Sequence, residues 1–402
     1  MERLTLQRAS EILLENVEKI EEYEEIPLWD ATGRILAEDV YALRNQPPFS
    51  RSPLDGYAVR SEDLKGASRE HPVILTVIDE VDAGHITEKR VGQKMAVRIM
   101  TGAPIPNGAD CVVGQEDTDY GEEMVAVYEE IGAYQNYCFE GEDYKTGARL
   151  LAKNMSLGFI EAGVLASLGR EKIKVFRRPK VAVLTTGDEL RLPGETLLPG
   201  KIYDSNLYTI VTRLRSLGME IAYYGRAEDD AGVVAERVRE AARDADLIIT
   251  TGGVSVGKKD IMHEVLTLLD CERLFWGIAI KPGMPTLCAK YQGKLLICLS
   301  GNPYGAAVNL ELLIRPVLAE MSGRYDLRIK RVNAVTESEF PKPSRVTRYV
   351  RARYADGRVW ISEGSNDSGI LSSMCGCNCL IEIPAGTRLL RKGEMVELVM
   401  LS

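Results

Sequence analysis

Residues 246–260, D-L-I-I-T-T-G-G-V-S-V-G-K-K-D, show most clearly how this chain folds. The apolar run 247–249 is typical of a buried strand, and residues 261–268 have helical spacing. Between them lies a turn rich in glycine, which lets a backbone approach a phosphate, while the start of the helix offers free N–H groups. We therefore predict a phosphate site here, and its candidate residues are Gly252, Gly253, Ser255 and Gly257.

Asp260 ends this segment and adds a carboxylate beside the predicted anion site. Such a carboxylate repels a phosphate unless a cation lies between them, which suggests a magnesium-bridged phosphate. Two alternatives stay open: a glycine-rich turn without a ligand, and a P-loop. The P-loop pattern G-x-x-x-x-G-K begins at Gly252 and includes Lys258, but Lys259 stands where that motif needs Ser or Thr.

Residues 178–326 alternate between apolar strand-like runs and helical patterns. This alternation predicts a doubly wound, mostly parallel sheet with helices on both faces. The runs V-L-T-T-G at 183–187 and I-I-T-T-G at 248–252 predict two similar turns at the carboxyl edge, where ligands bind in such sheets. The strands are expected at 181–184, 220–224, 247–249 and 295–299, and the helices at 206–217, 231–243, 260–269 and 304–320.

The remaining segments predict smaller parts. Thr5 can cap a helix whose apolar residues recur from Leu6 to Ile20, and a second helix is expected at 155–170, packed beside the first. Short β-type runs separated by Gly, Pro and Asp lie between these helices and again at the end of the chain. The predicted domains are 1–44 with 154–177 (helical), 45–153 (inserted β), 178–326 (α/β) and 327–402 (C-terminal β).

Composition excludes several classes of protein. The 402 residues carry 50 basic and 59 acidic side chains, a net charge of −9 without a long basic block, which argues against nucleic acid as a partner. Eight irregularly spaced cysteines indicate reduced thiols, and three histidines leave little room for histidine-based chemistry. Neither a signal peptide nor an apolar run of membrane length is seen, so we expect a soluble, cytoplasmic protein that contacts no membrane.

An ordered set of motifs resembles one known family. The motifs are P-P-F-S-R-S-P-L-D-G-Y-A-V (47–59), R-I-M-T-G-A-P-I-P-N-G-A-D (98–110), T-T-G-D-E-L (185–190), Y-D-S-N (203–206), E-D-D (228–230), T-G-G-V-S-V-G-K-K-D (251–260), I-K-P-G-M-P (280–285) and S-G-N-P-Y-G-A-A (300–307). Together they strongly resemble the molybdopterin molybdenumtransferase (MoeA) family, which includes the E domain of gephyrin.

The resemblance implies a reaction and an assembly. It implies insertion of molybdate into the dithiolene of adenylated molybdopterin, with magnesium-dependent release of AMP. It also implies an α/β domain like that of molybdopterin adenylyltransferase, a homodimer with its cleft at the subunit boundary, and possible contact with such an adenylyltransferase. The competing functions are a non-catalytic, gephyrin-like scaffold and a P-loop-like nucleotide hydrolase.

The resemblance also implies roles for individual residues. Glu189, Asp229 and Asp260 match acidic positions suited to magnesium on a pyrophosphate. Asp55 and Thr101 match functional positions in the inserted β domain. For the oxyanion molybdate, the candidates are Lys281, Ser300 and Arg351.

Simpler explanations exist for several of these residues. Glu189 and Asp260 suit the start of a helix, and Asp55 precedes a glycine as in a hairpin turn. Capping of a helix by Asp204 or Ser205 explains those two residues without any ligand.

The chain also departs from the family's pattern at two positions of the oxyanion site. Met284 stands where many members carry a second lysine, and Ser300 stands in L-S-G-N-P where many have L-P-G-N-P. Loss of the lysine removes a cation from the site, whereas the serine hydroxyl adds a donor. Separately, Cys375, Cys377 and Cys379 form C-x-C-x-C, which we interpret as thiols packed on one face of a strand rather than as a metal site.

Overall fold

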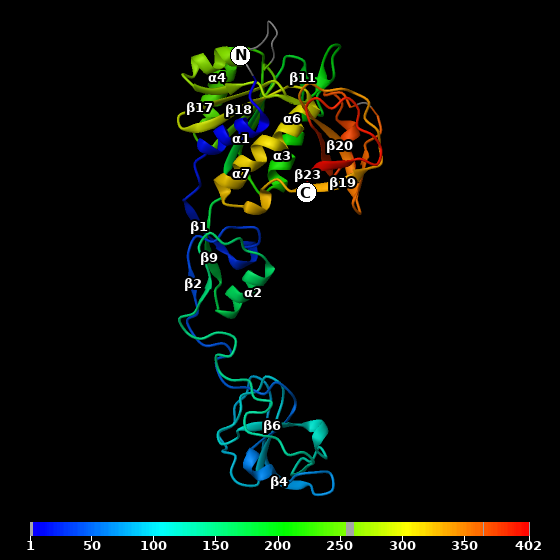
Figure 1. Cartoon of the computed structure of the whole chain (residues 1–402). Helices are drawn as coiled ribbons and strands as arrows, with labels where there is room; N and C mark the ends of the chain where they lie inside the picture. Colours follow the sequence, from blue (N-terminus) through cyan, green and yellow to red (C-terminus); the bar gives the residue numbers. More distant parts are fainter. Residues whose placement is uncertain (1–2, 255–260, 365, 402) are drawn as a thin grey trace. The chain divides into compact units, whose positions relative to one another are not determined.

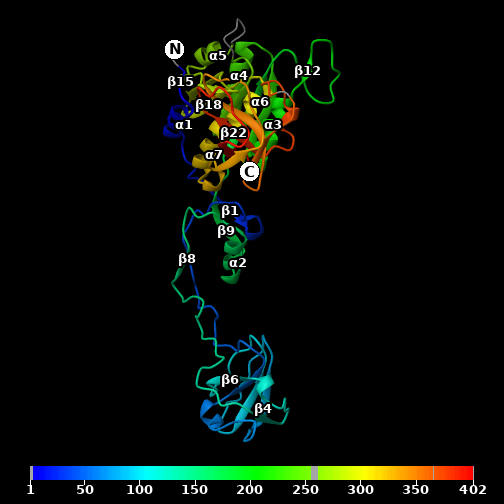
Figure 2. The same ribbon diagram turned by 45° about the vertical axis from the view of Figure 1, so that its right-hand side comes forward.

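The computed structural model describes residues 3–254, 261–364 and 366–401, and the chain divides into two compact units (Figures 1 and 2). The first unit consists of Met1–Ala37, Ser156–Gly158 and Lys172–Ser402, and the second of Glu38–Met155 and Phe159–Glu171. None of the described helices combines the length and the apolar character needed to cross a bilayer.

A six-stranded sheet forms the centre of the first unit, in the order β13-β10-β14-β18-β17-β15. Its first four strands run parallel, as predicted, and β17 and β15 add an antiparallel edge that the sequence patterns did not reveal. The strands are β10 (Lys180–Thr186), β13 (Glu220–Ala227), β14 (Leu247–Thr251), β15 (Glu272–Trp276), β17 (Thr286–Tyr291) and β18 (Lys294–Leu299).

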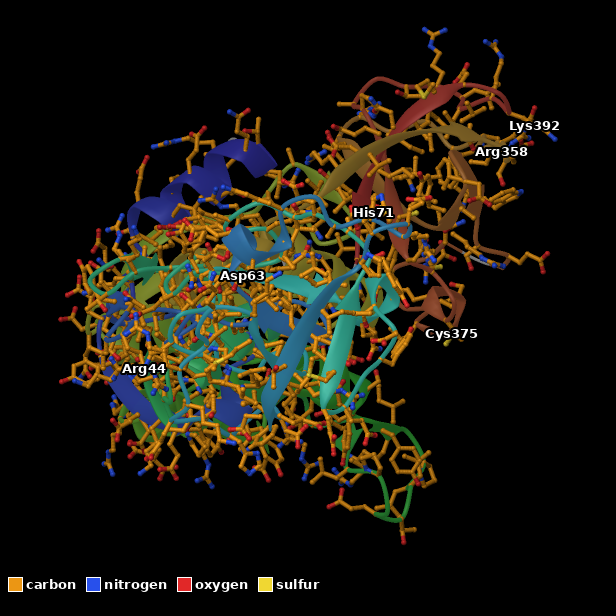
Figure 3. The ribbon with its side chains drawn as sticks, turned by 90° about the horizontal axis from the view of Figure 1, so that it is seen from below. Arg44, Asp63, His71, Arg358, Cys375 and Lys392 are labelled. Atoms are coloured by element: carbon orange, nitrogen blue, oxygen red, sulfur yellow. The ribbon has the colours of Figure 1, made fainter. Side chains whose placement is uncertain are left out.

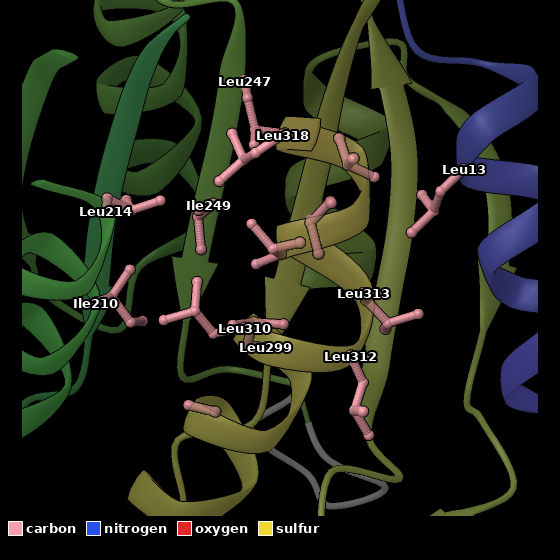
Figure 4. Packing of buried hydrophobic residues seen from close by; sticks show 14 of the residues in the cluster. Leu13, Ile210, Leu214, Leu247, Ile249, Leu299, Leu310, Leu312, Leu313 and Leu318 are labelled. Atoms are coloured by element: carbon pink, nitrogen blue, oxygen red, sulfur yellow. The ribbon is translucent and has the colours of Figure 1, made fainter. Parts of the chain in front are cut away.

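Helices cover both faces of this sheet, because consecutive strand residues point to opposite sides. Leu247 and Ile249 of β14 belong to one buried cluster, whereas Ile248 belongs to the other. Figure 4 shows the first cluster, in which Leu13 and Ile210 also pack. Its helices are α1 (Leu6–Glu15), α3 (Ser205–Ser216), α6 (Pro303–Asn309) and α7 (Arg315–Ser322), and those of the opposite face are α4 (Ala231–Ala242) and α5 (Met262–Leu268).

Local signals explain where several helices begin and end. The Thr5 hydroxyl caps α1 by accepting the Arg8 N–H at 3.2 Å, as predicted, but α1 ends at Glu15 and does not continue to Ile20. Asp204, not Ser205, caps α3 by accepting the Leu207 N–H at 3.0 Å. The expected single helix at 304–320 is divided by a π-helical turn, Leu310–Ile314, just before Pro316, which lacks an N–H for the helix ladder.

A second sheet in this unit includes the C-terminal residues. Its order is β16-β20-β21-β19-β23-β22, and an additional β20–β22 pairing closes the last five strands into a barrel. Strand β16 comes from the α/β part, so backbone pairing joins the two parts. The bounds are β16 (Ile280–Lys281), β19 (Arg331–Thr336), β20 (Thr347–Ala355), β21 (Arg358–Ile361), β22 (Cys379–Ile383) and β23 (Met395–Met400).

The three cysteines of the C-x-C-x-C motif do not lie on one strand. Only Cys379 belongs to a strand, where it is buried, whereas Cys375 is exposed after a 3-10 turn (Figure 3). The interpretation of three thiols on one strand is therefore wrong, because Gly376 turns the chain with a φ of +78°. Elsewhere on the barrel, Arg358 and Lys392 lie together and both pair with Glu337.

The second unit contains a five-stranded sheet in the order β6-β3-β5-β4-β7. Its strands are β3 (Gly56–Val59), β4 (Val73–Val81), β5 (Met95–Ile99), β6 (Cys111–Gly114) and β7 (Met124–Val127), accompanied by β2 (Val40–Tyr41), β8 (Arg149–Leu151) and α2 (Phe159–Ser167). The first unit adds the antiparallel pair β1 (Tyr23–Pro27) and β9 (Lys172–Phe176). Within the first unit, α1 packs on α7, whereas α2 belongs to the second unit.

Candidate active site

A cavity of about 640 Å³ lies at the carboxyl ends of β10, β14 and β18. Each of these parallel strands ends in a turn that contributes to the wall. The cavity brings together five residues predicted from the sequence: Glu189, Asp229, Gly252, Gly253 and Ser300. The other predicted residues of this region, Ser255, Gly257 and Asp260, lie outside the described part of the chain.

Glycine is required where the two Thr-Thr-Gly turns meet. Gly252 has a φ of +94°, and a Cβ placed there would lie 2.2 Å from the Thr186 carbonyl oxygen. At Gly187, the first turn's glycine, a Cβ would lie 2.8 Å from the Glu189 carboxylate. The echo in the sequence thus produces two turns in contact at one edge, with bare backbone facing the cavity.

Asp229 presents an unsatisfied oxygen in this cavity. Its Oδ1 is buried and has no hydrogen-bond partner among the described residues, while its backbone N–H donates to Asp188 Oδ1 at 3.2 Å. An orphaned carboxylate oxygen is costly, and a bound cation removes that cost. Glu189 lines the same cavity and is exposed. The described residues alone supply no group of three acidic, cysteine or histidine side chains placed to hold a metal.

Two further residues show how the wall is built. Asp204 is buried, accepts the Thr185 hydroxyl at 2.5 Å and caps α3, so the structural explanation holds for it. Asn206, which sequence reasoning did not single out, donates from Nδ2 to the Gly301 carbonyl at 2.9 Å. Asn206 therefore connects the turn after β18 to α3. The Y-D-S-N motif, which ends at Asn206, is the sequence feature that could have indicated this residue.

A second cavity of about 520 Å³ lies between the α/β part and the barrel. It shares Pro285, Ser300 and Asn302 with the first cavity, so the two hollows have a common wall. Its lining differs in charge, because three cationic side chains come from β16, from β20 and from the segment before β20: Lys281, Lys342 and Arg348. Met284, where the family pattern has lysine, lines this cavity too.

The three candidate molybdate ligands have different positions. Lys281 is exposed in the second cavity, and Ser300, largely buried, lines both cavities. Arg351 is completely buried and lines neither cavity. Its guanidinium donates to the carbonyls of Asp367, at 2.9 Å, and Ile370. Arg351 thus stabilises the 366–370 segment, which contributes to the cavity wall. Its own side chain does not line the cavity.

Sequence reasoning missed Arg348, three residues before Arg351. The two arginines leave opposite faces of β20, since their positions differ by an odd number, and only Arg348 lines the second cavity. Selecting between them required the two-residue strand β16, which no sequence pattern indicated.

Asp55 and Thr101 lie together in the second unit. The Asp55 carboxylate accepts both the Thr101 N–H and the Thr101 hydroxyl, each at 2.7 Å. These two hydrogen bonds lower the pKa of Asp55 below its ordinary value, because they stabilise the charged form. The pair therefore joins two motifs, L-D-G-Y and M-T-G-A, that are far apart in the sequence.

Comparison with known proteins covers nearly the whole chain. Three family models match in order: the MoeA N-terminal region (domain I and II) at 4–169, a probable molybdopterin binding domain at 182–320 and the MoeA C-terminal region (domain IV) at 333–401. Molybdopterin molybdenumtransferases of Staphylococcus aureus (strain COL) and Staphylococcus epidermidis (strain ATCC 35984) are each 36% identical over 378 residues, which is 93% of this chain and 90% of theirs.

Solved structures agree with these matches. A molybdopterin biosynthesis MoeA protein from Pyrococcus horikosii aligns over 100% of both chains with a TM-score of 0.86 and 32% identity. A second such structure, from Pyrococcus horikoshii OT3, covers 99% of this chain and 100% of its own, with a TM-score of 0.83 and 30% identity. By ordered family matches, by sequence identity and by fold, this chain belongs to the molybdopterin molybdenumtransferase (MoeA) family.

Proposed function

We propose that this protein completes the molybdenum cofactor by inserting molybdate into the dithiolene of adenylated molybdopterin, with magnesium-dependent release of AMP. One observation carries the proposal. A cavity with glycine turns and carboxylates shares a wall with a cavity that contains cations, and Ser300 lines both. A diphosphate in the first and an oxyanion in the second would therefore be held side by side.

In the first cavity, the backbone would bind the diphosphate and the carboxylates would bind magnesium. The turn at Gly252 and Gly253, which carry no side chains, offers backbone to the diphosphate. Glu189 and Asp229, with Asp260, would hold magnesium, and the orphaned Asp229 Oδ1 suits a cation. Bound magnesium supplies charge neutralisation on the phosphates and on departing AMP.

In the second cavity, molybdate is the substrate to be positioned. Lys281 provides a mobile cation and Ser300 a hydroxyl, both of which suit a tetrahedral oxyanion. The Ser300 hydroxyl oxygen lies 3.3 Å from the Asn302 backbone nitrogen and accepts its hydrogen bond, which leaves the hydroxyl proton for another acceptor. Arg351 supports this wall from behind.

The second unit would contribute to the active site through formation of a homodimer. Asp55 and Thr101 match functional positions of the family, and a homodimer with its cleft at the subunit boundary would bring them to the partner's α/β site. Cytoplasmic location and transient contact with a molybdopterin adenylyltransferase, which would supply the adenylated pterin, complete the proposal.

The test is release of AMP from adenylated molybdopterin by the purified full chain with molybdate and magnesium. Turnover that needs all three components is expected, and a mixture of Asp55→Asn and Asp229→Asn chains should regain activity only if subunits share sites. Failure to release AMP with verified substrate and metal would contradict the function. Hydrolysis of ATP without pterin would support the P-loop alternative instead.

A further inference from the structure

Lys281 and Arg348 form an unusual pair of neighbouring cations. Lys281 of β16 is the register partner of Arg348 of β20 in a parallel pairing. Both line the second cavity, so their side chains leave the same side of the paired strands. Asp367 is the acidic residue in the lining of this cavity, and no ion pair described for the structure joins it to Lys281 or Arg348. Like charges placed this closely repel each other unless an anion lies between them.

The surroundings of Arg348 make this arrangement more costly. Arg348 is only 9% exposed, and its Nε is buried without a hydrogen-bond partner in the described residues. The guanidinium carbon lies 5.3 Å from the centre of the Phe340 ring, which fixes the side chain's direction. Burial lowers the pKa of Arg348, since desolvation penalises the charged form. An unpaired, desolvated guanidinium is the kind of group that a bound oxyanion satisfies.

The contrast with Arg351 separates two roles. Arg351 uses its guanidinium on the carbonyls of Asp367 and Ile370 and lies 3.7 Å from the centre of the Tyr304 ring. The Nε of Arg348, like that of Arg351, is buried without a hydrogen-bond partner among the described residues, but Arg348 lines the cavity and Arg351 does not. Met284, an uncharged side chain, lines the same cavity.

We propose that Arg348 is a second cation of the oxyanion site, beside Lys281, while Arg351 is a positioning residue. The ligand class is a tetrahedral dianion, here molybdate, held between the Arg348 guanidinium and the Lys281 ammonium in a cavity whose third cation is Lys342. This inference rests on the proposed function for the identity of the anion.

Binding of sodium molybdate alone to the purified full chain tests this inference. Equilibrium dialysis with metal analysis, at fixed ionic strength, should show about tenfold weaker binding for Arg348→Gln, because a charge-assisted hydrogen-bond pair is lost. The matched control is Arg353→Gln, which removes the same charge from an exposed position on the same strand and the opposite face. It should change the dissociation constant by less than about twofold.

A rescue variant separates a missing cation from a general disturbance. Adding Met284→Lys to Arg348→Gln should recover most of the lost affinity, because the lysine lines the same cavity. Arg348→Met preserves the packing on Phe340 and should lose as much affinity as Arg348→Gln, which keeps the test valid if the glutamine variant folds poorly.

Two results would overturn the inference: a dissociation constant within twofold of the parent chain for a folded Arg348→Met or Arg348→Gln variant, or an equal loss in Arg353→Gln. Because molybdate binding is measured without pterin, the outcome is independent of AMP release. A chain that binds molybdate through Arg348 but releases no AMP would refute the proposed reaction alone. Normal AMP release with molybdate binding insensitive to Arg348 would refute this inference alone.

Discussion

The two cavities of the first unit share Pro285, Ser300 and Asn302 but differ in the charged residues that line them. The first is formed by turns at the carboxyl edge of one parallel sheet and contains Glu189 and Asp229. The second needs two sheets to meet and contains cations from both. Bare backbone with carboxylates selects a metal-bound phosphate, whereas converging cations select a free dianion. In the proposed reaction, their shared wall would hold the diphosphate and the oxyanion side by side.

The wall of the first cavity should tolerate change at one glycine and not at another. Gly252→Ala places a Cβ 2.2 Å from a carbonyl oxygen at a φ of +94°, so we expect a loss of about 3 kcal/mol or more in the free energy of unfolding. Gly369 lines the same cavity, but a Cβ added there would meet nothing within 4 Å, and Gly369→Ala should be nearly neutral. Urea unfolding measures both variants, and equal stabilities would contradict the close approach of the two turns.

The two arginines of β20 should differ in what they support. Arg351→Gln removes hydrogen bonds to two carbonyls in a fully buried site, so we expect a loss of about 2–3 kcal/mol in the free energy of unfolding. Arg348→Gln removes a desolvated cation whose Nε has no hydrogen-bond partner among the described residues, and should leave stability within about 0.5 kcal/mol. If thermal unfolding shows the reverse order, the assignment of roles on this strand is wrong.

The carboxylates of the first cavity should affect magnesium and not folding. Asp229→Asn should raise the magnesium concentration for half-maximal AMP release roughly tenfold, because a charged ligand becomes neutral. The neighbouring Asp230 caps α4 by accepting the Val233 N–H at 2.9 Å, and asparagine caps equally well. Asp230→Asn is therefore the matched control, and an identical magnesium requirement in the two variants would remove Asp229 from the metal site.

The smallest expected effect concerns the second cavity. Met284→Lys in the otherwise unchanged chain adds a fourth cation to a cavity that contains Lys281, Lys342 and Arg348, at a half-exposed position. We expect molybdate to bind two- to threefold more tightly, equivalent to about 0.5 kcal/mol, without a change in the magnesium requirement. A change in magnesium requirement instead would mean that the two cavities do not bind separate ligands.

Much of the first cavity could be predicted from the sequence. The T-T-G repeats at 185–187 and 250–252 follow apolar runs, and parallel strands bring such turns to one edge. Glu189, Asp229 and Ser300 were correctly placed around that edge, because each belongs to a segment directly after a strand. Local pattern was sufficient wherever one sheet alone determined the position of a residue.

The second cavity could be predicted only in part. Lys281 was identified by the I-K-P-G-M-P motif and lines the cavity, whereas Arg351, the other cationic candidate, is buried and lines neither cavity, and Arg348, which does line it, was not singled out. The sequence R-Y-V-R-A-R does not state which side of β20 meets the α/β part. The same limitation affected the cysteines, since the turn at Gly376 separates thiols that a continuous strand would have aligned.

The amino-acid sequence by itself determined the alternation of strands and helices, the glycine turns and the family of this protein, because these depend on neighbours along the chain. Only the tertiary structure decided that Arg348 lies beside Lys281 and that Arg351 is buried behind the wall. The physical reason is that strand pairing between distant segments sets which face of each strand is covered, and a shift of one residue reverses every side chain.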